Sequence, residues 1–249
     1  MKRIILAGAI ASILVGNLAH ADEPLPEHQL SFNAAVTSDY RYRGITQTRF
    51  DPALQGGVDY THTPTGLYAG AWGSTIRWTR DAGGSGNVEL DLYAGKRGEI
   101  AGGVTYDVGV LTYIYPSNGL GGVNGLTNAN TTELYGQIGY GPAYVKYSQA
   151  VTDLFGAVNS KNSGYLDLGA NLNVLEDLVL NLHVGRQTVK NNSTASYNDW
   201  KIGLTKDFGV VSGALAVIGT DANRQVYASP ANQKFMGRTA LVATISKAF

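Results

Sequence analysis

Apolar and polar side chains alternate at every second position along most of this chain. The clearest example is the stretch 87–97, where Val88, Leu90 and Leu92 alternate with Glu89 and Asp91. A period of two is typical of a β-strand that has one apolar and one polar face. After residue 21, no apolar run approaches the roughly 20 residues that a membrane-spanning helix needs. The pattern therefore predicts an all-β protein.

About twelve strands of roughly ten residues can be placed, and ten residues is the length that a tilted strand needs to cross a membrane. The predicted strands are 30–43, 54–60, 67–78, 87–97, 104–115, 133–140, 143–152, 164–174, 178–184, 197–208, 210–220 and 237–249. In the third strand, Tyr68, Trp72, Ile76 and Trp78 share one face. The links near residues 62–65, 98–103, 141–142, 176–177 and 208–209 are short, and the others are long.

This alternation of short and long links is typical of membrane β-barrels, which have short periplasmic turns and long outer loops. Because an open sheet edge cannot exist in lipid, the last strand, Gly237 to Phe249, must pair with the first. We therefore predict an antiparallel transmembrane β-barrel of about 12 strands with both termini in the periplasm. An edge strand of a soluble sandwich is the alternative for the last strand, but a sandwich has no reason to keep this rhythm of links.

The first 21 residues form a predicted secretory signal peptide. Lys2 and Arg3 precede an apolar run, and Ala19-His20-Ala21 follows it, so cleavage is expected after Ala21. Residues 22–29 are then a short periplasmic tail, and residues 30–249 are the outer-membrane β-barrel.

The expected location is the outer membrane of a Gram-negative bacterium. The expected partners are outer-membrane lipid, small hydrophilic solutes, and the barrel-assembly machinery, which would bind the C-terminal strand ending at Phe249. Aromatic residues at predicted strand ends would form two girdles at the membrane interfaces. The periplasmic girdle is Tyr60, Tyr140, Phe208 and Phe249, and the outer girdle is Tyr40, Tyr42, Trp78 and Tyr197.

Composition and charge exclude several classes of function. The 19 basic residues become 17 without Lys2 and Arg3, and against 19 acidic residues the net charge is −2. This near-neutral balance argues against a nucleic-acid partner. There is no cysteine, so a disulfide framework or a thiolate metal site is excluded. The four histidines are scattered, and the loop 119–125 (GLGGVNG) lacks the third glycine of a dinucleotide fingerprint. No metal and no cofactor is therefore expected.

The polar faces of the strands are predicted to line a narrow lumen, because ~8 strands leave a filled interior whereas 16–18 enclose an open channel. Opposite charges across a constriction would create a transverse field that orders small polar solutes. The alternative is that these charges pair with one another and stabilise a filled lumen. The predicted pore-lining residues are Asp39, Arg41, Arg43, Glu89, Asp91, Arg97, Glu133, Asp167, His183 and Lys201.

Six motifs, in this order, resemble those of a known family. They are SDYRYRG (38–44), DPALQGGVDY (51–60), GLYAGAW (66–72), ELDLYAG (89–95), YDVGVLTYIYP (106–116) and the ending TISKAF (244–249). Over essentially the whole mature chain, they resemble the TorF-type porins, the Gcw_chp group of proteobacterial outer-membrane proteins. The resemblance implies an outer-membrane barrel with a channel role and no assigned substrate, and it adds no catalytic residues.

Three classes of function remain. We favour a porin-like channel for passive diffusion of ions or small hydrophilic solutes through a narrow mixed-charge lumen. The second class is a non-conducting structural or adhesive barrel that acts through the loops Ser117 to Asn130 and Asp221 to Met236. An enzyme is the least favoured, because His183 is the one histidine inside a strand, and Ser148 and Ser212 are candidate nucleophiles only by elimination. No catalytic residue is therefore predicted.

Overall fold

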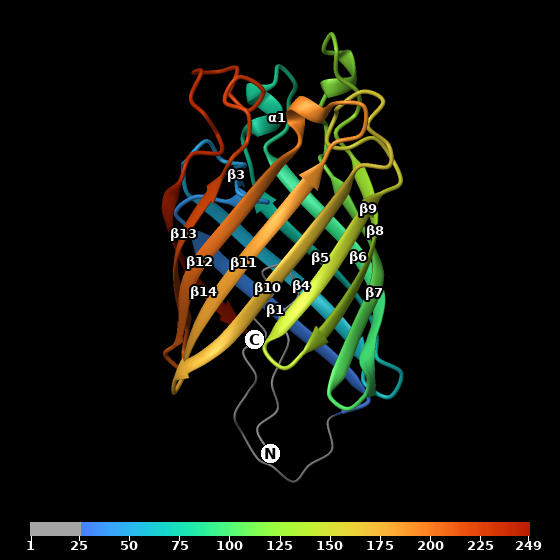
Figure 1. Cartoon of the computed structure of the whole chain (residues 1–249), viewed down its shortest axis with the longest axis vertical. Helices are drawn as coiled ribbons and strands as arrows, with labels where there is room; N and C mark the ends of the chain where they lie inside the picture. Colours follow the sequence, from blue (N-terminus) through green and yellow to red (C-terminus); the bar gives the residue numbers. More distant parts are fainter. Residues whose placement is uncertain (1–25) are drawn as a thin grey trace.

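Twelve long antiparallel strands close into one barrel in the computed structural model, which describes residues 26–249. Each strand pairs with its neighbours along the chain, and the last, β14, closes the barrel against the first, β1 (Figure 1). The predicted signal peptide and its cleavage after Ala21 lie outside the described residues. The barrel strands are β1 (His28–Thr37), β4 (Ala53–His62), β5 (Leu67–Thr75), β6 (Val88–Ala101), β7 (Val104–Ile114), β8 (Thr131–Tyr140), β9 (Ala143–Ala150), β10 (Gly164–Leu175), β11 (Leu178–Thr188), β12 (Tyr197–Asp207), β13 (Ser212–Thr220) and β14 (Ala240–Ala248).

Long loops and short turns lie at opposite ends of the barrel, so the predicted rhythm of links is confirmed. The short turns and the carboxyl terminus are at one end, and the long loops are at the other (Figure 1). The long connections are 38–52, 76–87, 115–130, 151–163, 189–196 and 221–239. They contain the short hairpin β2 (Arg41–Tyr42) and β3 (Ile45–Thr46), the single helical turn α1 (Trp78–Asp81), and two 3₁₀ turns (Leu120–Gly122 and Ser193–Ala195).

The outer wall of the barrel is an apolar belt. Exposed leucine, isoleucine, valine and phenylalanine side chains point outward from nearly every strand, including Phe32, Leu92, Leu134, Leu168 and Ile202. Soluble monomers rarely expose contiguous apolar patches of more than a few hundred Å². A belt that continues around the wall is the surface that hydrocarbon requires. Among residues 26–249, no helix is both long enough and apolar enough to cross a membrane.

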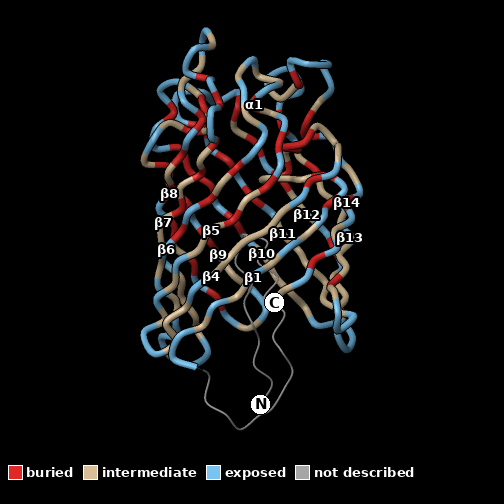
Figure 2. Tube along the Cα trace, turned by 180° about the vertical axis from the view of Figure 1, so that it is seen from behind, coloured by how far each residue is buried: buried red, intermediate tan, exposed pale blue. Residues whose placement is uncertain are grey.

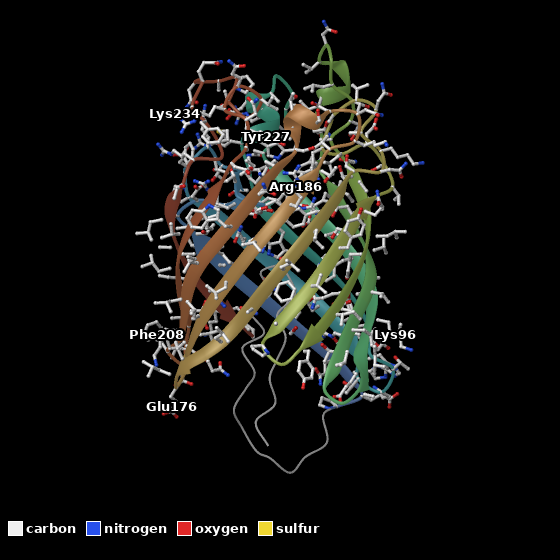
Figure 3. The ribbon with its side chains drawn as sticks, viewed as in Figure 1. Lys96, Glu176, Arg186, Phe208, Tyr227 and Lys234 are labelled. Carbon is white, nitrogen blue, oxygen red and sulfur yellow. The ribbon has the colours of Figure 1, made fainter. Side chains whose placement is uncertain are left out.

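The predicted aromatic girdle is confirmed at the short-turn end and wrong at the long-loop end. Tyr60, Tyr140, Phe208 and Phe249 are exposed near the turns, and Figure 3 shows Phe208 there beside Glu176. In contrast, the four residues of the predicted outer girdle face the interior: Tyr40, Tyr42, Trp78 and Tyr197. The reason is that the chain turns inward after β1 and β5 end, whereas Tyr197 has the inward parity of β12.

The first and third predicted strands extend too far at this end. The first ends at Thr37 instead of Arg43, and the third ends at Thr75 instead of Trp78. In β5, the face that carries Tyr68 and Trp72 points inward, while Leu67 and the alanines point to the outside. The aromatic side of this strand is therefore a lumen surface. Sequence parity alone separates the two faces but does not say which of two apolar faces is inside.

Candidate functional site: the barrel interior

The connection between β1 and β4, residues 38–52, folds into the barrel and crosses its interior; we call it the inward loop. Asp39 organises this loop. Its carboxylate accepts hydrogen bonds from Arg41 Nε at 2.6 Å, from Thr48 Oγ1 at 3.3 Å and from Thr46 Oγ1. Because three donors of the loop converge on one buried carboxylate, the loop has its own folded core of polar contacts.

A second nitrogen of the Arg41 guanidinium, Nη1, binds the loop to the rest of the barrel end. Arg41 Nη1 donates to the carbonyl oxygen of Gly44 at 2.9 Å and to that of Arg238 at 3.0 Å, just before β14. The side chain is almost completely buried, as is that of Asp39. Arg41 therefore neutralises Asp39 and holds the inward loop against the chain that enters the closing strand.

Arg43 and Gly44 form the tip of the β2–β3 hairpin. Both have positive φ, 45° and 79°, as the two central residues of a type I′ turn require. From this tip, the Arg43 side chain spans the lumen to three strands of the opposite wall. Its guanidinium donates to Glu133 Oε2 on β8 at 2.7 Å and to Gln187 Oε1 on β11 at 2.6 Å, and it lies 4.1 Å from the centre of the Tyr165 ring on β10.

Charge pairing keeps Arg43 ionised inside the barrel. Burial disfavours the charged guanidinium, but the adjacent Glu133 carboxylate outweighs burial, and the pKa of Arg43 is raised well above its ordinary value. The side chains of both residues are less than one tenth exposed. Because removing one partner leaves a buried charge uncompensated, this ion pair fixes the position of the hairpin tip.

The hairpin tip also has no room for a side chain at Gly44. A Cβ atom there would lie 2.8 Å from Asp199 Cβ on β12 and closer still to Thr220 Cγ2 on β13. Gly44→Ala is therefore expected to displace the tip and to lower the denaturant midpoint of unfolding more than Gly209→Ala does. Gly209 is the matched control, because its φ is +82° and a Cβ atom there meets nothing within 4 Å. Equal decreases of the denaturant midpoint in the two variants would show that the loss of stability comes from the positive φ alone and not from the contacts of the hairpin tip.

Aromatic side chains fill the barrel on the other side of the inward loop. Tyr40 Oη donates to Glu89 Oε1 on β6 at 2.5 Å, and Tyr42 Oη donates to Tyr113 Oη on β7 at 2.7 Å. Phe155, from the β9–β10 loop, packs edge-on against both Tyr42 and Tyr113. Buried residues accordingly gather in the half of the barrel nearer the long loops (Figure 2). The inward loop and this cluster together form the constriction of the interior.

Below the constriction, an imidazole lies between two carboxylates. His183 Nδ1 is 2.8 Å from Asp167 Oδ1, and His183 Nε2 is 2.7 Å from Asp199 Oδ1. Tyr165 Oη donates to Asp199 Oδ2 at 2.9 Å. With both ring nitrogens facing carboxylates, the ring is held across β10, β11 and β12. Neither Ser148 nor Ser212 is hydrogen-bonded to it within the described residues, so this arrangement is not a nucleophile–base pair.

Tyrosines lie flat on the inner wall because glycines stand beside them on the neighbouring strand. A Cβ atom on Gly70 would be 2.5 Å from the ring of Tyr93, and one on Gly109 would be 2.6 Å from the hydroxyl of Tyr135. The Tyr93 hydroxyl donates to Asp59 at 2.5 Å. Because each tyrosine ring lies against the glycine beside it, the ring occupies less of the lumen than a ring that projects toward the barrel axis.

Lys146 on β9 and Lys201 on β12 face the same interior without a paired carboxylate. Within residues 26–249, neither ammonium group has a hydrogen-bond or ion-pair partner, and the Lys146 side chain is buried. Lys146 Nζ lies 4.1 Å from the centre of the Tyr135 ring, which is a cation–π contact. An ammonium group without a carboxylate partner is stable in a barrel only if water hydrates it. The interior here is therefore polar, and hydration of these two groups is expected.

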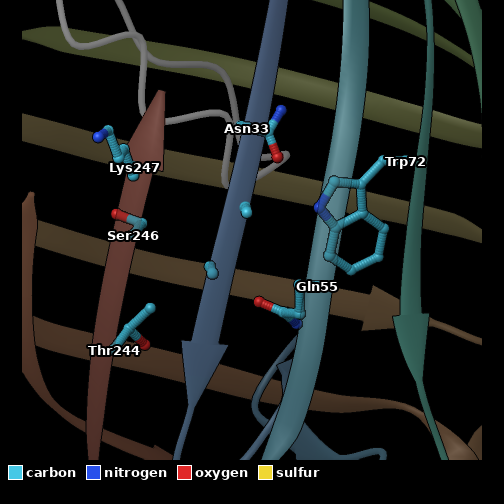
Figure 4. A pocket seen from close by; sticks show the side chains of 8 residues that line it. Asn33, Gln55, Trp72, Thr244, Ser246 and Lys247 are labelled. Carbon is cyan, nitrogen blue, oxygen red and sulfur yellow. The ribbon is translucent and has the colours of Figure 1, made fainter. Parts of the chain in front are cut away.

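The opposite wall is formed by β1, β4 and β14. A cavity of about 30 Å³ lies against it (Figure 4). Its lining residues are Asn33, Ala34, Ala35, Gln55, Trp72, Thr244, Ser246 and Lys247. The volume is sufficient for one or two water molecules.

All ten predicted pore-lining residues lie on the inner side of the barrel, although whether they line a conducting pore is a separate question. Seven are on strands, as predicted: Glu89, Asp91, Arg97, Glu133, Asp167, His183 and Lys201. The prediction that Asp39, Arg41 and Arg43 belong to the first barrel strand is wrong, because β1 ends at Thr37 and they lie on the inward loop. Most charges are paired, but Asp91 Oδ1 is buried with no partner among the described residues.

Four residues outside the predicted set complete this interior: Lys146, Tyr165, Gln187 and Asp199. The alternation along their strands was sufficient to predict that these side chains face the lumen. Each lies on the same strand face as a predicted pore-lining residue or beside one in the register. Tyr165 and Gln187 bind Arg43, and Asp199 binds His183.

A closed antiparallel barrel with an apolar outside and a charged, polar inside is a transmembrane β-barrel. The chain belongs to the Gcw_chp family, described as a bacterial protein of unknown function, and the match covers residues 21–249. A TorF-type assignment within this group remains a prediction. No curated protein sequence matches the chain.

Among solved structures, two porins share the fold. The KdgM porin is 6% identical with a TM-score of 0.52, over 88% of this chain and 97% of its own. The NanC porin is 11% identical with a TM-score of 0.53, over 89% of this chain and 99% of its own. At such low identity the likeness concerns the fold, and function has to be argued from the residues.

Proposed function

We propose that this protein is an outer-membrane channel through which ions or small hydrophilic solutes diffuse passively. The observation that carries the proposal is the pair Lys146 and Lys201, which face the interior without a bonded carboxylate in a barrel whose outer wall is apolar. A purely structural barrel gains nothing from unpaired ammonium groups in its interior. The shared fold with two porins supports the same reading.

The proposed orientation puts the short turns and both termini in the periplasm and the long loops outside the cell. Membrane barrels of known topology have this arrangement of turns and loops. The closing strand then ends at the periplasmic interface, where Phe249 is exposed on the outer wall and pairs with Phe32 through two backbone hydrogen bonds of 2.9 and 3.2 Å. We propose that the barrel-assembly machinery binds this strand.

The inward loop is the proposed filter of the channel. Asp39 pairs with Arg41, and Arg43 pairs with Glu133, so the opposite charges at the constriction largely compensate each other. A strong field is therefore expected from the unpaired ammonium groups of Lys146 and Lys201 more than from the loop. Solutes would have to be small, because aromatic side chains and the hairpin tip share the cross-section.

The test is single-channel recording of the mature protein, refolded and inserted in a planar bilayer. Stepwise ion conductance is the expected result, with a change in ion selectivity when Lys146 and Lys201 are both replaced by glutamine. A folded, heat-modifiable barrel that never conducts would refute the channel.

The second candidate is a non-conducting structural or adhesive barrel, and the filled constriction is the observation that favours it. In that case the long loops carry the function. Tyr227 in the loop 221–239 donates to the carbonyl oxygen of Ala195 at 2.6 Å, so this loop is folded onto its neighbour and presents a defined surface. Absence of conductance, together with surface binding that is lost when the loop 221–239 is shortened, would support this candidate.

A further inference from the structure

Two histidines that are far apart in the sequence meet at the short-turn rim of the barrel. His28, at the start of β1, pairs directly with His62, at the end of β4, in the antiparallel register. Their ring centres are 5.2 Å apart. Both belong to the outward face of their strands, as do Leu30 and Tyr60. The pair therefore lies outside the lumen, at the edge of the apolar belt.

Glu27 completes a triad with these histidines. Its Oε1 atom lies 3.2 Å from His62 Nε2 and 3.8 Å from His28 Nε2, and the three ligand atoms all lie within 4.8 Å of one another. In a tetrahedral site with ligand bonds near 2.0–2.1 Å, neighbouring ligand atoms are separated by about 3.4 Å. The observed distances are close to this edge length, so an ion fits between the three atoms after small side-chain movements.

Backbone hydrogen bonds hold Glu27 in position, so its side chain is not needed for this. The backbone N–H of Thr63, in the β4–β5 turn, donates to the carbonyl oxygen of Glu27 at 2.8 Å, and Thr63 Oγ1 donates to that of Pro26, also at 2.8 Å. The start of the chain is thus tied to the turn that follows His62. The carboxylate is two-thirds exposed and available to an ion from solvent.

The second ring nitrogen of each histidine already has a hydroxyl partner. His28 Nδ1 lies 2.8 Å from Tyr60 Oη, and His62 Nδ1 lies 2.7 Å from Thr65 Oγ1. When Nδ1 carries the proton and donates to the hydroxyl oxygen, Nε2 is left with a free lone pair that points toward Glu27. Such partners orient the histidine ligands of metal sites and fix their tautomer.

We propose that Glu27, His28 and His62 bind a divalent transition-metal ion such as Zn²⁺ or Cu²⁺ at the rim of the barrel. Two imidazoles and one carboxylate suit these ions, whereas Mg²⁺ and Ca²⁺ prefer oxygen ligands alone. Water would occupy the fourth position, as in sites with three protein ligands. The bound ion would clamp the residues before β1 to the end of β4. The proposal is independent of conduction, since the site lies outside the lumen.

The experiment titrates the refolded mature protein in detergent micelles with Cu²⁺ and follows its electron paramagnetic resonance spectrum, with Zn²⁺ titration calorimetry in parallel. We expect one ion per chain and hyperfine coupling to two imidazole nitrogens. His28→Ala and His62→Ala should each weaken binding at least 10-fold, and Glu27→Gln should weaken it measurably. Tyr60→Phe and Thr65→Val keep all three ligands and should weaken binding about 10-fold, as removal of supporting hydrogen bonds does.

Two controls keep the result specific. Glu176→Gln removes an exposed carboxylate at the same end of the barrel, near Phe208, and should leave affinity unchanged (Figure 3). The double variant His28→Ala/His62→Ala keeps His183, and heat-modifiable migration in gels shows whether it is folded. Full-strength binding in the folded double variant would overturn the proposal, and so would the absence of saturable one-to-one binding by the wild type. In the latter case, the triad is a hydrogen-bonded cluster that holds no metal ion.

Discussion

Arg43→Ala is expected to detach the hairpin tip from the opposite wall and to raise the single-channel conductance. The variant removes two hydrogen bonds, to Glu133 and Gln187, and the cation–π contact with Tyr165. It also leaves Glu133 buried without its counter-charge, which is expected to cost about 3–5 kcal/mol of stability. Conductance in a planar bilayer and urea unfolding measure the two effects.

A double variant separates opening of the lumen from loss of stability. In Arg43→Ala/Glu133→Gln the buried charge is gone, so most of the stability should return while the conductance stays high. Arg186→Ala is the control, because Arg186 points outward near the long loops and makes one hydrogen bond of 3.3 Å, to Asn198 (Figure 3). Wild-type conductance in Arg43→Ala would show that the inward loop does not depend on this anchor.

Ile202→Arg is expected to destabilise the barrel in lipid by about 2–4 kcal/mol, the cost of an arginine on the lipid face near the bilayer midplane. Ile202 lies in the middle of β12 and is half-exposed on the outer wall. Its partners in the register are Leu182 on β11 and Val217 on β13, so its surroundings are apolar on both sides. Urea unfolding in lipid vesicles measures the change.

Val226→Arg is the matched control for this substitution. Val226 is similarly exposed but lies in the loop 221–239, outside the barrel wall, so its replacement should change stability by less than about 0.5 kcal/mol. The same small change for Ile202→Arg would mean that β12 does not face hydrocarbon. Detergent micelles adapt to a charged residue more readily than a bilayer does, so the difference between the variants should be larger in vesicles.

The barrel fold could be predicted because the features that specify it lie within single strands and the short turns between them. A period of two along β6, β8 and β11 separates an apolar face from a polar face, and short turns mark where consecutive strands pair. For the same reason the inward direction of Glu89, Asp167 and His183 followed from parity. The inward face could not be predicted where both faces of a strand are apolar or aromatic, as in β5, since parity then does not define the inside.

The inward loop could not be predicted from the same signal. Asp39, Tyr40, Arg41, Tyr42 and Arg43 continue the alternation of β1 without a break, so the sequence suggests a longer strand. What ends the strand is Asp39, whose partners Thr46 and Thr48 come later in the chain. The contacts that hold Arg43 come from β8, β10 and β11, about 90 to 144 residues away.

The sequence by itself determined the class of this protein: an antiparallel membrane barrel of twelve strands with a charged inner face. That outcome depends on residue spacing along single strands, which a linear pattern contains in full. Only the tertiary structure decided where the lumen narrows and which charges meet, because closing the barrel places β8 opposite the inward loop. It also placed His28 beside His62, since the register of β1 and β4 is set by pairing along the whole length of both strands.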